Sequence, residues 1–136
     1  MQITWAFFHA LQKRSVAMER SIGLTGPQRL VLRIVGRYPG ISARELAETL
    51  HIHASTLTGV AGRLAERRLL TRLGDPSDRR RVRYKLTERG RAFDVPRGGT
   101  VESAIEAALR RAPPGQVRAA RALLNQLTAQ LESTPE

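Results

Sequence analysis

The segment of residues 69–90, which reads LLTRLGDPSDRRRVRYKLTERG, constrains the fold of this chain most strongly. Two short stretches rich in apolar residues flank a turn rich in Asp, Pro and Arg, and a helix start follows at once. This pattern predicts a β-hairpin of residues 69–73 and 82–86 whose long connection protrudes as a flexible loop. Along 82–86, apolar residues alternate with Arg83 and Lys85, so we expect one apolar face and one cationic face.

A polar helix is predicted immediately before the hairpin, over residues 53–68. Its inner face consists of Leu57, Ala61 and Leu64, whereas the small and polar residues of this segment largely face outward. A helix with a small, polar exposed side can approach base edges closely, and an arginine-tipped hairpin can reach phosphates or the next minor groove. The two elements together indicate a reader of double-stranded DNA.

The distribution of charge supports this interpretation. The 136 residues include 23 basic and 12 acidic ones, a formal net charge of +11, and nearly all of the basic residues are arginines. A coding bias alone can enrich arginine, but it would not concentrate the charge. Residues 61–91 carry eleven basic and four acidic residues, a net charge of +7 in under a quarter of the chain. This concentration indicates an anionic partner.

Other classes of protein are excluded by composition. The chain has no cysteine, which removes disulfides, thiolate catalysis and cysteine-based zinc sites or redox sensing. No apolar run is long enough to span a bilayer, and no secretory signal is visible, so we expect a cytoplasmic protein with no membrane partner. The length suits one domain with a real core.

Helices are predicted on both sides of the hairpin by apolar spacing and capping signals. Thr25 with Gln28 and Ser42 with Glu45 fit two capping boxes. The expected helices cover residues 3–22, 25–37, 41–52, 87–94, 100–111 and 116–131. Buried faces are assigned to Leu30, Val31, Ile34 and Val35 in the second helix and to Leu46, Ala47 and Leu50 in the third. Pro113, Pro114 and Gly115 are expected to form a turn.

The predicted fold is therefore mainly α with a small β-hairpin wing. Residues 25–90 form a winged helix-turn-helix domain, and residues 1–24 and 91–136 form terminal dimerisation helices. The apolar stripes of the two ends are larger than this small middle part can cover, so we expect a homodimer that buries them. The residues assigned to this interface are Phe8, Leu11, Val117, Leu124, Leu127 and Leu131.

The order of these motifs resembles the MarR family of bacterial transcriptional regulators. The similarity is close over residues 24–90, and its most specific part is the string Asp75, Asp78, Arg79, Arg80, Leu86, Thr87 and Gly90. The resemblance implies a homodimeric repressor on a pseudo-palindromic operator. It also implies that a small phenolic or lipophilic ligand releases the DNA by binding between the dimer lobe and the DNA lobe.

The resemblance also assigns roles to individual residues of the predicted recognition helix, residues 54–67, and of the wing. Arg80 matches the wing arginine that enters the minor groove, and Asp78 orients the wing. Ser42 caps the helix before the recognition helix, predicted over residues 41–52, and can hold a phosphate at the N-terminus of that helix. The remaining expected DNA contacts are Ser55, Thr56 and Thr58 at base edges or nearby phosphates, and Arg63, Arg79 and Arg81 at phosphates.

Two positions depart from the family pattern. Gly59 stands where the family often carries a long polar or basic residue, which removes one candidate base contact. The sequence VPRGG at 95–99 interrupts a helix that is usually continuous, so we predict a break between Asp94 and Thr100, either as a ligand-responsive hinge or as a tolerated kink.

No catalytic or metal site is predicted. His51 and His53 are expected to be exposed or helix-capping, and Glu106 is expected to pair with Arg110 on a solvated helix face. Phosphate loops, nucleophile elbows and triads are not visible, which argues against an enzyme and against any cofactor. The alternatives to a sequence-specific regulator are a nonspecific DNA-coating protein and a winged helix used for protein interaction.

Overall fold

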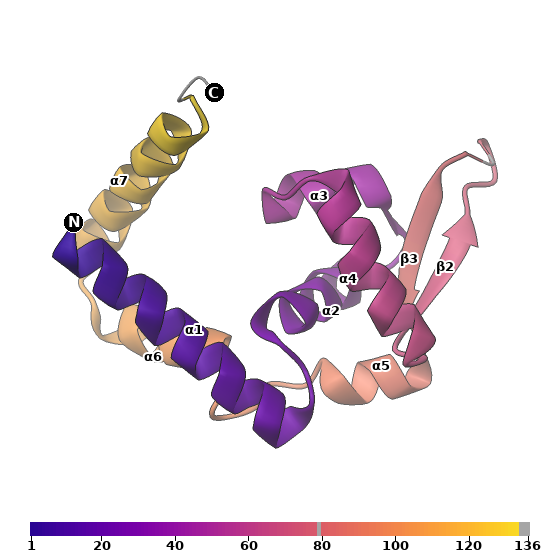
Figure 1. The fold of residues 1–136 in the computed structure, drawn as a ribbon, viewed down its shortest axis with the longest axis horizontal. Helices are drawn as coiled ribbons and strands as arrows, with labels where there is room; N and C mark the ends of the chain where they lie inside the picture. Colours follow the sequence, from indigo (N-terminus) through magenta and orange to yellow (C-terminus); the bar gives the residue numbers. More distant parts are fainter. Residues whose placement is uncertain (79, 134–136) are drawn as a thin grey trace. The chain divides into compact units, whose positions relative to one another are not determined.

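A computed structural model of the chain describes residues 1–78 and 80–133. Figure 1 shows a mainly helical molecule with one β-hairpin, which is the predicted fold class. Residues Met1–Val101 and Glu102–Glu136 form two separate compact units. In chain order the elements are α1 (Gln2–Ile22), α2 (Gly26–Arg37), β1 (Ile41–Ser42), α3 (Ala43–Leu50), α4 (Ala54–Glu66), β2 (Leu70–Gly74), β3 (Val82–Leu86), α5 (Glu88–Phe93), α6 (Val101–Arg111) and α7 (Pro114–Glu132).

The helix starts follow the capping signals of the sequence. At α2 the Thr25 hydroxyl accepts the amide of Gln28 at 3.4 Å, and the Gln28 side chain accepts the amide of Thr25 at 3.1 Å. Ser42 and Glu45 form the same reciprocal pair at the start of α3. Both predicted capping boxes are therefore confirmed. Helix α1 ends at Gly23, whose φ of 71° is the left-handed conformation that glycine adopts readily.

The core of the first unit lies between α2, α3, α4 and the hairpin. Val31 and Val35 are buried as predicted, but Leu30 is 49% exposed and Leu32 is fully buried instead. The prediction for Leu30 was wrong because the buried side of α2 is wider than the apolar residues of its sequence indicated. Helix α2 also packs against α5, and both Arg29 and Leu32 are buried. Leu30 therefore lies on the side of α2 opposite the centre of its buried arc.

The sheet contains a short strand that the sequence did not indicate. β1 pairs antiparallel with β3, with Ile41 opposite Tyr84, so the strand order is β1-β3-β2. A two-residue strand shows no alternation, which explains why it was missed. β2 and β3 form the predicted hairpin, which extends away from the helices in Figure 1. β1 fixes the wing to the start of α3.

The predicted break after α5 is confirmed. Helix α5 ends at Phe93, and α6 begins at Val101. Two arginines of α2 hold the end of α5: Arg29 is 1% exposed and donates to the carbonyl oxygens of Phe93 and Val95, and Arg33 donates to the carbonyl and carboxylate of Asp94. Guanidinium groups thus satisfy the helix-end carbonyls that a continuous helix would have used.

The last helix begins earlier than predicted. Pro114 and Gly115 lie in the first turn of α7, and only Pro113 stays outside it. A proline at the first helical position loses no hydrogen bond, so the turn is shorter than the sequence suggested. The predicted pair of Glu106 and Arg110 is present on α6 at 3.7 Å.

The apolar residues assigned to dimerisation lie on surface helices. In α7, Leu124, Leu127 and Leu131 are 54%, 45% and 78% exposed, and Val117 is half-buried. In α1, Phe8 is 46% exposed and Leu11 is half-buried. Within residues 1–78 and 80–133, no helix combines the length and apolarity that crossing a membrane requires.

Arg68 ends α4 in a conformation that suits glycine, with φ of 58°. The amide of Leu69 bonds to the carbonyl of Leu64 at 2.9 Å, and the amide of Arg68 bonds to that of Ala65 at 2.8 Å, which is a Schellman motif. We expect Arg68→Gly to raise the free energy of unfolding by about 1 kcal/mol, because the Cβ penalty disappears. Urea denaturation at one protein concentration measures this, and a destabilised variant would contradict it.

Candidate nucleic-acid interface

Helix α4 presents a polar side to solvent. Its buried side consists of Leu57, Val60, Ala61 and Leu64, each at most 6% exposed. Ser55, Thr56 and Thr58 are exposed, as predicted. The hydroxyl of Thr58 donates to the carbonyl of Ala54 at 2.8 Å, so its proton is already used. The hydroxyls of Ser55 and Thr56 have no partner within the described residues and are available to an external ligand.

The loop at the tip of the hairpin is shaped by Asp78. The carboxylate of Asp78 accepts the amide of Arg80 at 2.9 Å and lies 3.4 Å from Nε of Arg81. The carbonyl of Asp78 accepts the amide of Arg81 at 2.9 Å. These contacts suit a residue that orients the wing, and the side chain of Arg80 stays exposed. Arg79, a third predicted DNA contact of the wing, lies outside the described residues.

Asp75 fixes the base of the same loop. Its carboxylate accepts the hydroxyl and amide of Ser77, at 2.6 and 2.9 Å, and Nε of Arg83 at 2.8 Å. These hydrogen bonds, first from Ser77 and then from Arg83, hold the pKa of the Asp75 carboxyl far below its ordinary value. Asp75 is 4% exposed, so this carboxylate is a structural part of the wing.

Arg83 and Lys85 alternate with buried Tyr84 along β3 as predicted, but Arg83 is engaged within the wing. This side chain pairs with Asp75 and also donates to the carbonyl of Gly40 at 3.1 Å. Its charge is neutralised because the loop turns back over the strand. Lys85 remains exposed as predicted.

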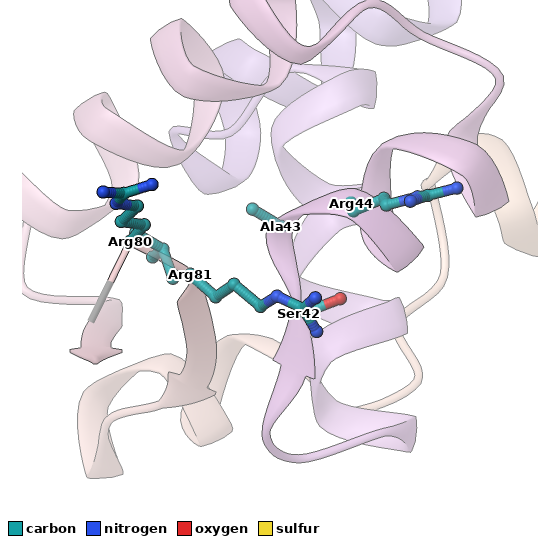
Figure 2. A pocket seen from close by; sticks show the side chains of 6 residues that line it. Ser42, Ala43, Arg44, Arg80 and Arg81 are labelled. Atoms are coloured by element: carbon teal, nitrogen blue, oxygen red, sulfur yellow. The ribbon is translucent and has the colours of Figure 1, made fainter. Parts of the chain in front are cut away.

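A hollow of about 310 Å³ separates the wing from the N-terminus of α3, and Ser42, Arg44, Arg80 and Arg81 are among its lining residues. Figure 2 shows the side chain of Arg81 extended toward Ser42, whereas Arg80 points away from it. Arg44 was not singled out in the sequence, because nothing local distinguishes it from other helical arginines. Nε of Arg44 also pairs with the Glu48 carboxylate at 2.8 Å, but three arginines leave the lining positive overall, which suits a phosphate group.

Ser42 itself is engaged in capping. Its hydroxyl accepts the amide of Glu45 at 3.2 Å and donates to the Glu45 carboxylate at 2.6 Å. Hydrogen bonds from Ser42 lower the pKa of the Glu45 carboxyl, so this group is an anion at neutral pH. A phosphate at this helix end would therefore meet the amides of Ala43 and Arg44 rather than a free Ser42 hydroxyl.

The histidines occupy helix ends. His51 closes α3 in a left-handed conformation, and His53 is the N-cap of α4; both are exposed. This confirms the predicted capping positions. Across residues 1–78 and 80–133, no group of three or more His, Asp or Glu side chains could hold a metal ion.

Comparison with known proteins shows a similarity to one family. A sequence model of the MarR family matches residues 22–81, which span α2 to the wing. The organic hydroperoxide resistance transcriptional regulator of Bacillus subtilis is 27% identical over 104 residues, which cover 73% of this chain and 69% of that protein. Residues 22–81 of this chain are thus similar to the MarR family. The curated relatives are transcriptional regulators rather than enzymes.

Solved structures of MarR-family proteins share the fold of this chain. BpsR of Bordetella bronchiseptica is 27% identical, with a TM-score of 0.68 over 94% of this chain and 99% of that one. MepR of S. aureus, solved in a complex with DNA, has a TM-score of 0.79 over 96% of both chains at 16% identity. The winged-helix fold predicted from the sequence is thereby confirmed.

Proposed function

We propose that this protein is a sequence-specific repressor that binds double-stranded DNA with α4 in a major groove and the wing beside it. The observation that carries the proposal is the exposed polar side of α4, which lies in the same compact unit as a wing whose Arg80 side chain is exposed. Hydroxyls of Ser55 and Thr56 can contact base edges, and Arg81 and Arg44 can contact phosphates. The MepR–DNA complex supports this use of the shared fold.

The active form is a homodimer on a pseudo-palindromic operator. We assign residues 25–90 to DNA binding and residues 1–24 and 91–136 to dimerisation. The exposed apolar side chains of α1 and α7 support this assignment, because a water-exposed row of leucines on one helix is unfavourable unless a partner covers it. Two copies related by a two-fold axis would present two α4 helices to successive turns of one duplex.

DNA release by a small phenolic or lipophilic molecule is part of the proposal. It is supported by BpsR, whose DNA binding is regulated by 6-hydroxynicotinic acid. A thiol-based response to peroxide is not part of it, because the 136 residues contain no cysteine. The site of action is the cytoplasm, where chromosomal operators lie.

Selection of bound duplexes from a random pool tests the proposal against its alternatives. A sequence-specific regulator enriches one motif, and adding a panel of phenolic acids lowers the recovery of that motif. A DNA-coating protein binds without enrichment, since phosphate contacts alone carry no sequence information. A protein-interaction module recovers no DNA. Either of the last two results would contradict the proposal.

Arg80→Ala is expected to weaken binding to the enriched duplex about 10-fold, equivalent to roughly 1.4 kcal/mol, because the wing loses its contact in the minor groove. Fluorescence anisotropy with a labelled duplex measures the change. Arg110→Ala, which removes the same charge from an exposed residue of α6, serves as the control and should leave affinity nearly unchanged. Equal losses in the two variants would show that Arg80 acts only through net charge.

A further inference from the structure

The exposed side of α4 carries no long side chain before Arg63, which lies in the last turn of the helix. Ser55, Thr56, Thr58 and Gly59 are all exposed and small, and Arg63 is the next exposed position along the helix. A helix with so little bulk on its outer side can lie close to base edges. The identity of the bases that it selects must therefore depend strongly on Arg63.

Arg63 is free to serve an external ligand. Within the described residues it forms no ion pair or hydrogen bond through its side chain. The neighbouring Arg67 is different, because its guanidinium donates to the carbonyl of Gly23 at 2.5 Å and so fastens α4 to the end of α1. Arg63 is thus the unpaired guanidinium of this helix.

The direction of the Arg63 side chain depends on Gly59. Nη1 of Arg63 lies 3.9 Å from the point where a Cβ on Gly59 would stand, so the guanidinium runs back along α4 over a bare backbone. Helical side chains lean toward the N-terminus of their helix, and residues i and i+4 share one face. A long side chain at position 59 would compete for this space.

We infer that Arg63 reads a guanine in the major groove, with Gly59 providing the space that lets it do so. The inference rests on the proposed DNA-binding function and changes the role of Arg63 from a phosphate contact to a base contact. The five N–H donors of a guanidinium form a planar fork that pairs with O6 and N7 of guanine, and this bidentate contact is specific. The ligand class is a duplex with a guanine in each half-site.

The test compares the sequences that wild type, Arg63→Ala and Arg63→Lys select from a random duplex pool. Wild type should prefer guanine at one position of each half-site by about 5- to 150-fold, the range of a bidentate pair. Arg63→Ala should lose that preference and keep the preferences at other positions. Arg63→Lys should weaken it, because an ammonium group lacks the planar fork of a guanidinium. Arg63→Lys retains the charge, so its salt dependence should match that of wild type. Arg44→Ala should instead weaken all sequences equally.

Position 59 offers a second pair of variants. Gly59→Ala places its Cβ in ordinary contact with Arg63 and should keep the guanine preference. Gly59→Leu should displace Arg63 and reduce that preference. A uniform loss of affinity in both Arg63 variants, with guanine preference intact, would overturn the inference and leave the proposed function standing. A wild type that selects no motif would contradict the proposed function itself.

Discussion

Gly90→Ala is expected to lower the free energy of unfolding by about 3 kcal/mol, which is the upper end of the usual cost of overpacking. A Cβ on Gly90 would overlap the carbonyl oxygen of Leu69, and the opposing group is backbone rather than a flexible side chain. That carbonyl accepts the amide of Thr87 at 3.1 Å, and the Thr87 hydroxyl donates to the carbonyl of Arg68 at 2.7 Å. The added methyl group would force α5 away from the end of α4.

Chemical denaturation followed by far-UV circular dichroism measures this loss. Gly62→Ala is the matched control, because no heavy atom lies within 4 Å of its added Cβ and it sits inside α4. Alanine is a better helix former than glycine, so this variant should be more stable than wild type by up to about 1 kcal/mol. Equal stabilities of the two variants would show that α5 does not need close contact with Leu69.

Leu127→Glu should convert the proposed homodimer to a folded monomer. It should also lower affinity for a two-half-site operator at least about 100-fold, because the second half-site is no longer bound by a linked subunit. Leu127 is 45% exposed on the apolar side of α7, close to Leu124 and Leu131. A carboxylate buried there against a second copy would lack a partner. Sedimentation velocity measures the mass, and anisotropy measures the affinity.

Gln126→Glu controls for the added charge, since position 126 faces away from the apolar stripe of α7. This variant should remain dimeric and bind the operator as wild type does. A Leu127→Glu protein that stays dimeric would remove α7 from the interface. A monomeric Leu127→Glu protein with full operator affinity would contradict the requirement for two subunits.

The starts of α2, α3 and α5 could be predicted from the sequence because capping is local. Thr25, Ser42 and Thr87 each accept the amide three residues later, so four consecutive residues contain the whole signal. The hairpin and the break at residues 94–100 were also predictable, since alternation, proline and paired glycines act through short-range geometry.

Features that depend on distant segments could not be predicted. β1 exists because Ile41 meets Tyr84, and Leu30 is exposed because α5 packs on the other side of α2. The pairing of Arg83 with Asp75 requires the loop to fold back on its strand. In the candidate site, helical periodicity predicted that the hydroxyl side chains of α4 are exposed. The path of the Arg63 side chain over Gly59 could be seen only in the three-dimensional structure.

The junction after α5 combines both kinds of information. The sequence marks the break, whereas the structure shows that Arg29 and Arg33 hold it against α2. Gly36 permits the close approach of Asp94, because a Cβ there would overlap the Asp94 carboxylate. The end of α5 is therefore clamped to α2, so a hinge at this break would have to lie after Val95.

Footprinting of the selected duplex tests whether two copies of the chain bind two successive major grooves. Two α4 helices in successive major grooves should protect guanine N7 from methylation in two clusters about 10 base pairs apart, and the two wings should protect the flanking minor grooves from hydroxyl radicals. This symmetric pattern is the predicted result. Uniform protection along the duplex, or protection of one groove by a single subunit, would contradict the account.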